Sequence, residues 1–125
     1  MKRKLIWIFA LALLITLMFS ISVHAYTSYQ TISSDQDGAW GPDSYASDDV
    51  FIKGNNYSSS TNTLWVAGQT QGYKVFGHTF GNIPIGIGTT NSRTATQVIE
   101  HKYHVILDPA GPLAKGCNGW GYIDD

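Results

Sequence analysis

The residues best suited to do chemistry lie in an acidic stretch between positions 35 and 49. Five of the nine acidic residues of the chain fall there: Asp35, Asp37, Asp43, Asp48 and Asp49. Carboxylates on a glycine-containing loop can hold calcium, which takes about six to eight oxygen ligands. The pattern permits a calcium site on Asp35, Asp37, Asp48 and Asp49, although the third acid and the closing Glu of an EF-hand are missing. The alternative is a solvated loop in which Asp forms turns through backbone hydrogen bonds.

Two aromatic residues, Trp40 and Tyr45, lie in the same acidic stretch. An aromatic ring on a loop can stack on a sugar ring while a carboxylate such as Asp43 accepts hydrogen bonds from the hydroxyls. Trp120, in the glycine-rich tail, has the same potential. Exposed aromatic residues often mark recognition surfaces, so we predict a ligand-binding set of Trp40, Tyr45, Asp43 and Trp120. The alternative is that both tryptophans fold back onto the core.

The single cysteine, Cys117, follows His104 by thirteen residues. A nearby imidazole lowers the pKa of a thiol and makes it a nucleophile, so the pair permits a small thiol enzyme. The Gly116-Cys117 step after a histidine-bearing strand resembles that of cell-wall L,D-transpeptidases, but no His precedes Gly116 and no Arg follows Cys117. A buried thiol or a disulfide-linked dimer through Cys117 are the alternatives. Neither a Gly-x-Ser-x-Gly elbow nor a phosphate-binding glycine loop occurs, and we expect a protein that is not an enzyme.

The first 25 residues have the pattern of an export signal. Three basic residues at positions 2–4 precede an apolar run from Leu5 to Val23, and Ala25 supplies a small residue at the exit. We therefore expect a cleaved signal peptide over residues 1–25. The alternative is an uncleaved N-terminal anchor, because the run has the length of a membrane-spanning helix. In both cases residues 26–125 face outward, secreted or held at the cell surface, and the short basic start is typical of bacterial export.

Residues 26–125 are acidic and rich in turn formers. They hold five basic and nine acidic residues, a formal net charge of −4, which excludes a basic nucleic-acid binder. The leader is the only predicted contact with a membrane. One Glu, no Met and three Leu leave this part poor in helix formers, whereas its thirteen Gly and ten Thr favour short strands and tight turns. About 100 residues are enough for one core.

Alternation of apolar and polar residues predicts six or seven strands. Their expected ranges are 26–32, as an edge strand, 50–53, 63–69, 72–80, 81–88, as an edge strand, 96–107 and a short last strand within 116–122. The strands at 63–69 and 72–80 should form a hairpin, with a loop over 33–49 and a turn at 54–56. We expect most of the thirteen aromatic residues to fill the core. The fold class is thus all-β, a single small antiparallel β-sandwich or barrel.

These observations favour a secreted binding module that presents loop aromatics and carboxylates to an extracellular ligand, either a cell-wall polymer, a glycan or a protein. An exported bacteriocin-like or toxin-like antagonist is the alternative, because the apolar segment Ile83–Ile87 can meet a membrane or a receptor. The net charge of −4 opposes attack on anionic membranes. A thiol enzyme built on Cys117 and His104 is the second alternative. Apart from calcium, we expect no cofactor.

Overall fold

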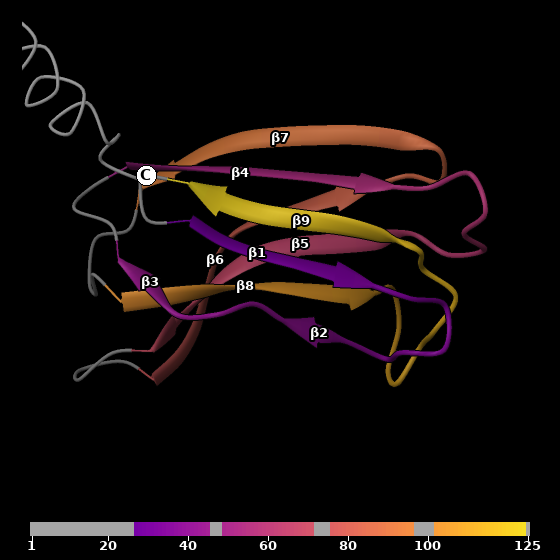
Figure 1. Ribbon diagram of the computed structural model, residues 1–125, viewed down its shortest axis with the longest axis horizontal. Helices are drawn as coiled ribbons and strands as arrows, with labels where there is room; N and C mark the ends of the chain where they lie inside the picture. The colour runs from indigo at the N-terminus through magenta and orange to yellow at the C-terminus, as the bar shows by residue number, and fades with distance from the viewer. Residues whose placement is uncertain (1–26, 46–48, 72–75, 97–101, 125) are drawn as a thin grey trace, which may run out of the picture.

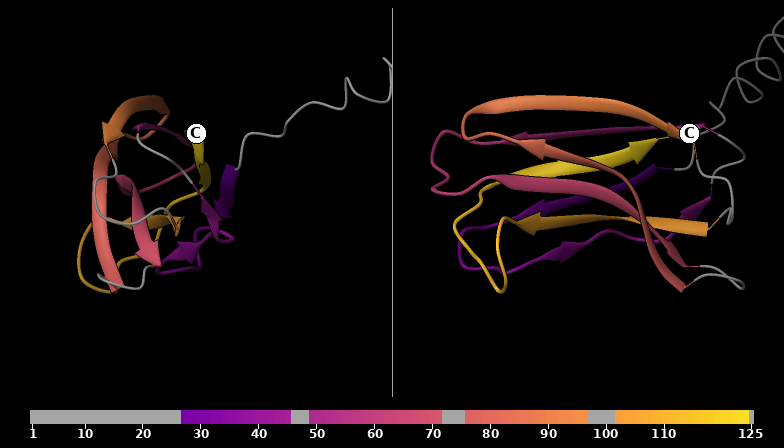
Figure 2. Two further views of the ribbon diagram at one scale, coloured as in Figure 1. Left: turned by 90° about the vertical axis from the view of Figure 1, so that its left-hand side faces the viewer. Right: turned by 180° about the vertical axis from the view of Figure 1, so that it is seen from behind.

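The computed structural model describes residues 27–45, 49–71, 76–96 and 102–124, and this part of the chain is built of strands. The strands are β1 (Thr27–Ile32), β2 (Ala39–Trp40), β3 (Ser44–Tyr45), β4 (Asp49–Asn56), β5 (Leu64–Gln71), β6 (Phe76–Ile85), β7 (Thr89–Thr96), β8 (Lys102–Pro109) and β9 (Gly119–Asp124). They form two antiparallel sheets, β1-β9-β4-β7 and β2-β8-β5-β6, with β3 paired to β8. The sheets lie face to face (Figures 1 and 2), so the predicted fold class is confirmed in its sandwich form.

Several predicted strands are confirmed with small changes of boundary. β1 lies at the edge of its sheet, β5 and β6 pair as an antiparallel hairpin, and the glycine-rich tail forms β9. The separate strands expected at 72–80 and 81–88 were wrong in one respect, because β6 runs without a break through residues 76–85. β9 lies between β1 and β4 and thus has a partner on each side. The predicted leader at residues 1–25 and the residues 72–75 between β5 and β6 lie outside the described residues. Within the described ranges, the structure contains no helix long and apolar enough to cross a membrane.

Other boundaries were wrong. The expected loop over 33–49 contains β2 and β3, which pair with β8. The expected turn at 54–56 is the end of β4, and β7 was not predicted because its sequence TTNSRTAT has no apolar alternation. The long strand expected over 96–107 is divided: Thr96 ends β7 in one sheet and Lys102 begins β8 in the other. Residues 97–101 lie outside the described part.

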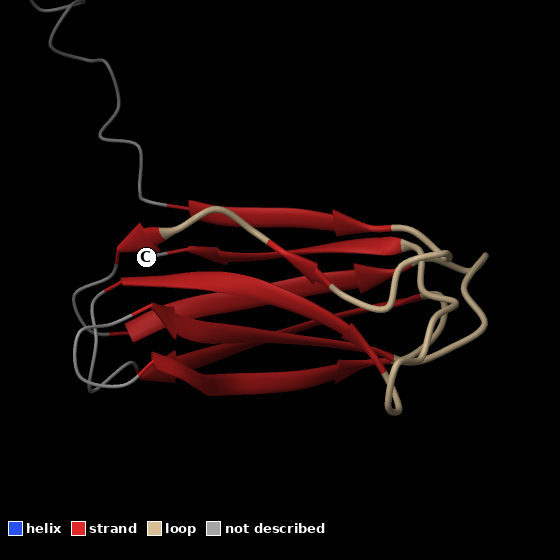
Figure 3. Cartoon of the chain, turned by 90° about the horizontal axis from the view of Figure 1, so that it is seen from below, coloured by secondary structure: helices blue, strands red, loops and turns tan. Residues whose placement is uncertain are grey.

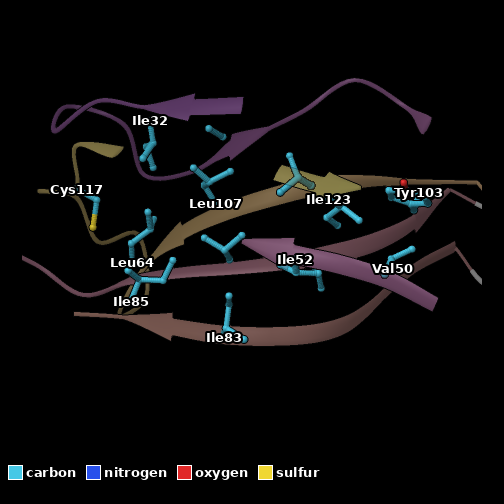
Figure 4. Packing of buried hydrophobic residues seen from close by; sticks show 13 residues of the cluster. Ile32, Val50, Ile52, Leu64, Ile83, Ile85, Tyr103, Leu107, Cys117 and Ile123 are labelled. Atoms are coloured by element: carbon cyan, nitrogen blue, oxygen red, sulfur yellow. The ribbon is translucent and has the colours of Figure 1, made fainter. Parts of the chain in front are cut away.

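The core between the sheets is aliphatic. In the described part, the buried apolar cluster consists of Ile, Leu, Val and Ala side chains with Cys117, and Tyr103 is its one fully buried aromatic residue. Figure 4 shows these side chains between the sheets, with Cys117 near Leu64 and Tyr103 at the far end. The expectation that aromatic residues fill the core was therefore wrong. Most described aromatic side chains lie on the outer faces instead, and Trp40 is 59% exposed.

A pair of glycines explains why the core excludes large rings. Gly54 of β4 and Gly121 of β9 are directly paired and both face the core. A Cβ atom added at Gly54 would lie 2.5 Å from Cδ1 of Ile85 and 2.8 Å from Cγ2 of Val66. One added at Gly121 would lie 2.8 Å from Cγ1 of Val66. The facing sheet thus inserts Val66 and Ile85 into the space that two missing side chains leave.

Several loops gather at one end of the sandwich (Figure 3), and hydrogen bonds join them. Asn118 is the hub of this network: its side-chain oxygen accepts a bond from the Ser34 amide at 3.0 Å and its carbonyl accepts one from the Tyr57 amide at 2.7 Å. The Gly116 carbonyl accepts a bond from the Thr61 amide at 2.8 Å. Three loops distant in sequence are therefore held together without a disulfide.

The close approach at Gly54 generates a stability prediction. Gly54→Ala places a methyl group against Ile85, Val66 and the Trp120 carbonyl, so we expect a loss of about 1–3 kcal/mol of unfolding free energy from overpacking. Gly86→Ala is the matched control, because its nearest neighbour would be 3.6 Å away, and we expect a change within about 0.5 kcal/mol. Urea denaturation of the two variants measures the difference; equal stabilities would disprove the close-packing argument.

Candidate functional site

A hollow of about 560 Å³ lies on the outer face of the β2-β8-β5-β6 sheet. Its lining residues are Trp65, Ala67, Thr79, Asn82, Ile106, Asp108, Gly111 and Pro112. A smaller hollow of about 210 Å³ shares Ile106 and Asp108 with the first and is also lined by Asp37, Gly38, Trp40, Gln69 and Leu107. The right panel of Figure 2 shows the molecule from the side of β5 and β6. The two hollows together form the candidate site, which we call the groove.

Strand alternation explains why these side chains point outward. Leu64, Val66 and Leu107 are buried in the core, so the residues between them on β5 and β8 must face away from it. The register then places Trp40 and Ala67 on opposite sides of Ile106. Trp65 lies two residues along β5 from Ala67, and β8 separates β2 from β5. Trp40 and Trp65 therefore stand roughly 12 Å apart, diagonally across the sheet. Two tryptophans therefore flank an apolar floor.

Trp40 is exposed but its backbone is fixed from both sheets. The Gln30 side-chain amide donates a hydrogen bond to the Trp40 carbonyl at 2.8 Å, and the next amide, of Gly41, bonds to the Val105 carbonyl at 2.8 Å. The Trp40 ring lies beside Gly38, where an added Cβ would be 3.1 Å from it. The ring is thus presented from a short strand rather than from a free loop.

One end of this face carries a polar cluster around His104. The imidazole Nε2 donates to the Gln69 side-chain oxygen at 2.9 Å, and Nδ1 lies 3.6 Å from Oδ1 of Asp43. The other oxygen of Asp43 lies 3.4 Å from Nζ of Lys102. Burial lowers the pKa of His104 and the Asp43 carboxylate opposes that shift. Gln69, which also lines the smaller hollow, is held in position by this cluster.

Two carboxylates lie at the smaller hollow beside Trp40. Burial is the main cause that raises the pKa of Asp108, and the charge of Asp37 raises it further. Both side chains line the same hollow. They supply hydrogen-bond acceptors next to an exposed aromatic ring, which is the chemistry a hydroxyl-rich ligand requires.

The structure divides the predicted ligand-binding set between two faces. Trp40 lines the smaller hollow, Asp43 joins the His104 cluster, and Tyr45 is 51% exposed on β3 opposite Lys102. Trp120 lies on β9, in the other sheet. The first three residues thus belong to the side of the groove, whereas Trp120 belongs to the opposite face.

Trp65 is the groove residue that sequence reasoning missed. The signal was present in β5, where Trp65 alternates with Leu64 and Val66 and shares its face with Ala67 and Gln69. A large aromatic residue on the less apolar face of a strand is a surface residue, because the strongly apolar face takes the core. Asn82, Thr79 and Asp108 could not be placed beside it without the register.

Of the four carboxylates in the calcium hypothesis, the three that the structure describes do not converge on one point. Asp35 accepts a hydrogen bond from the Ser33 hydroxyl at 2.6 Å, which lowers its pKa, and Asp37 lines the smaller hollow. Asp49 accepts a bond from the Thr96 hydroxyl at 2.7 Å and begins β4. The eight residues of β4, roughly 25 Å, separate Asp49 from the loops at the other end of the sandwich, where Ser34 and therefore Asp35 lie. Asp48 lies outside the described residues. Across the described ranges, no three His, Cys, Asp or Glu side chains form a group that could hold a metal ion. Calcium binding by Asp35, Asp37, Asp48 and Asp49 stays a prediction.

Cys117 and His104 are not brought together. Cys117 is fully buried, with Sγ 3.4 Å from the Asn62 carbonyl, and burial raises the pKa of its thiol. Cys117 lies at the loop end of the core. His104 lies on the outer face of β8, roughly six residues or 20 Å along the strand from Ala110, the residue that follows β8 at the loop end. His104 therefore does not supply the imidazole that thiol catalysis needs. The buried thiol also has no access to a second chain in this fold.

The apolar segment that motivated the antagonist hypothesis is mostly internal. Ile83 is 4% exposed and Ile85 is fully buried in the core, and Ile87 alone of the three isoleucines is exposed. The segment therefore offers a membrane or receptor little apolar surface.

Comparison with known proteins gives one likeness of structure. Neither a family model nor a curated protein matches the sequence. The chain is similar to the carbohydrate-binding module CBM6cm-2 from Cellvibrio mixtus lichenase 5A, solved in complex with cellotriose. The identity is 15% and the TM-score 0.42, over 79% of this chain and 86% of that module.

The position of Cys117 predicts its reactivity. The native protein should react with iodoacetamide near neutral pH only as fast as it unfolds, because the thiol is enclosed and its pKa is raised. Ser58→Cys combined with Cys117→Ala is the control, since position 58 is exposed and should be labelled at once. Mass spectrometry follows both reactions. Fast labelling of native Cys117 would restore the thiol-enzyme hypothesis.

The Asp37–Asp108 pair predicts a pH dependence of stability. The folded-state pKa of Asp108 is raised, so ionisation of this group opposes folding above that pKa and the cost disappears below its ordinary pKa near 3.8. Asp108→Asn should therefore raise the melting temperature at pH 7 and have no effect at about pH 3. Asp35→Asn should lack this gain, because the pKa of Asp35 is shifted downward. Thermal melts across this range measure both, and an equal gain at both pH values would contradict the electrostatic cause.

Proposed function

We propose that the protein is an extracellular carbohydrate-binding module that holds a glycan chain in the groove between Trp40 and Trp65. The observation that carries this proposal is the pair of tryptophans flanking an apolar floor with polar side chains at its edges. The extracellular setting rests on the leader pattern of residues 1–25.

The lining of the groove suits a sugar ring. The C–H groups of a pyranose present an apolar, slightly positive face, which the negative face of an indole attracts. The hydroxyls at the ring edge need donors and acceptors in fixed places. Asn82 supplies both, Thr79 supplies a hydroxyl, and Asp108 supplies an acceptor.

The rigidity of the groove favours binding. Trp40 is fixed through bonds to β1 and β8, Gln69 through His104, and Trp65 lies within the paired strand β5. A tryptophan side chain loses few rotamers when it is immobilised. A ligand that enters this site therefore orders little of the protein, which lowers the entropic cost of association.

The charge and size of the groove separate a glycan from other ligands. Among the described lining residues, the ionisable side chains are the carboxylates of Asp37 and Asp108. An acidic groove repels nucleic acid and anionic lipid. A stable protein partner needs about 800 Å² on each side with an apolar centre, whereas this site is a hollow of about 560 Å³ whose lining mixes apolar side chains with Thr79, Asn82 and Asp108. An uncharged polysaccharide is not repelled by the carboxylates and needs only a hollow of this size.

The proposal predicts selective loss of binding. Trp40→Ala and Trp65→Ala should each weaken retention about tenfold or more in affinity gels containing hydroxyethylcellulose, xylan or mannan, and in sedimentation with cell-wall sacculi. Both residues lie outside the core, so the melting temperature should change little. Tyr57→Ala is the matched control, because Tyr57 is 46% exposed in the loop after β4 and lines neither hollow.

Three outcomes decide whether the groove is the binding site and whether calcium takes part. Unchanged retention in folded Trp40→Ala and Trp65→Ala proteins would exclude the groove as the site. An equal loss in Tyr57→Ala would show a non-specific effect of exposed rings. Repeating the wild-type assay with a calcium chelator tests the calcium hypothesis, since loss of retention would show that binding needs calcium.

A further inference from the structure

A second aromatic surface lies on the opposite side of the sandwich. It consists of Tyr29 on β1, Trp120 and Tyr122 on β9, and Phe51 on β4, which we call the aromatic strip. The Trp120 and Tyr122 rings are nearly parallel, 8° apart with centroids at 5.8 Å. Tyr29 and Phe51 continue the strip on either side, each with a centroid distance of 6.4 Å to its neighbour. The four rings thus belong to three neighbouring strands, β1, β9 and β4, whose order is seen in Figure 1.

Alternation again places the strip. In β9 Gly119, Gly121 and Ile123 are buried, so Trp120 and Tyr122 face outward. The register then pairs Tyr29 with Tyr122 across β1 and β9. Tyr29 is 49% exposed and Phe51 40% exposed. The strip lies on the β1-β9-β4-β7 sheet and therefore shares no residue with the groove.

The area around the strip is polar and close to neutral. Beyond Phe51 the outer face continues onto β7 with hydroxyl and amide side chains, where Asn55 donates to the Thr90 hydroxyl at 2.6 Å. The described charges on this face are those of Lys53, Asp49 and Asp124, and the Asp49 carboxylate accepts a bond from the Thr96 hydroxyl. With one basic and two acidic side chains, this face lacks the basic charge that binding to an anionic polymer or membrane requires.

The size of the strip argues against a second copy of the chain as its occupant. From the exposed fractions and about 150–250 Å² for each aromatic side chain, the strip exposes roughly 300 Å² of ring surface. A stable dimer needs about 800 Å² per partner with an apolar centre. A patch of this size matches the largest apolar patch of a typical monomer, which is often functional.

We propose that the aromatic strip is a second carbohydrate-binding surface, which takes an uncharged polysaccharide chain lying across β1, β9 and β4. The rings contact the apolar C–H faces of the sugars, and the hydroxyl and amide side chains that border the strip bond to their hydroxyls. The site stands independently of the groove. One molecule with ligand sites on opposite sheets joins two polymer chains, or two segments of one chain.

The test separates the two faces with a variant that lacks the groove tryptophans. In the Trp40→Ala, Trp65→Ala protein, retention in gels of hydroxyethylcellulose, xylan or mannan should persist, and adding Trp120→Ala or Tyr29→Ala should lower it about tenfold. Adding Tyr57→Ala instead should leave it unchanged. Melting temperatures of all variants confirm folding, and Tyr29→Ala on an edge strand is the second variant in case Trp120→Ala does not fold.

Fluorescence provides a readout that does not depend on substitution of the strip. In the Trp40→Ala, Trp65→Ala protein, Trp120 is the only tryptophan within residues 26–125. Titration with hydroxyethylcellulose, xylan or mannan should shift its emission to shorter wavelength, because a sugar on the strip removes water from the indole.

The outcomes distinguish this proposal from the proposed function. If the groove variant loses all retention on every polymer and its Trp120 emission stays constant, the strip is not a site and the groove alone binds. If the groove substitutions have no effect while Trp120→Ala abolishes retention, the strip stands and the groove assignment fails. Retention on polygalacturonate but on none of the uncharged polymers would overturn the choice of a neutral chain.

Discussion

The fold depends on how closely its two sheets approach at the Gly54–Gly121 pair. Two adjacent inward positions without side chains let Val66 and Ile85 of the facing sheet sit almost against the backbone. The space that remains is filled by branched aliphatic residues. Rings as large as those of Trp40, Trp65 and Trp120 have no place there, so alternation directs them to the two outer faces. The same constraint therefore fixes the core and provides both candidate binding surfaces.

A narrow aliphatic core of this kind needs support at its ends, because the chain has one cysteine and no disulfide. Hydrogen bonds supply it. Asn118 and Gly116 join three loops at one end, and Ser28 reaches from β1 into the other sheet, donating to the Pro42 carbonyl at 2.6 Å and accepting from the Val105 amide at 2.9 Å. The segment held by Ser28 directly follows Trp40. The bonds that close the sandwich therefore also fix one wall of the groove.

The sequence predicted the fold class well, because alternation in β5, β8 and β9 is a property of the chain itself. It did not predict the role of Gly54-Asn55-Asn56, since a local turn signal says nothing of the side chains that a distant strand inserts. β7 was missed for the related reason that its residues are exposed along an edge and carry no apolar pattern. For the site, composition identified Trp40 and Trp120 as exposed candidates. Only the register shows that they belong to different sheets and that Trp65 and Asp108 accompany Trp40.

The groove shows a local conflict that the rest of the sandwich avoids. Asp37 and Asp108 line one hollow with no described basic residue lining it, and their repulsion together with burial raises the pKa of Asp108. A chain optimised for stability alone would place an amide there. A carboxylate at this position instead offers strong acceptors to a ligand that brings hydroxyl donors, and under the proposed function the hydrogen bonds from such a ligand offset the repulsion. The strain at Asp108 is therefore in line with a surface shaped for a polyhydroxylated partner.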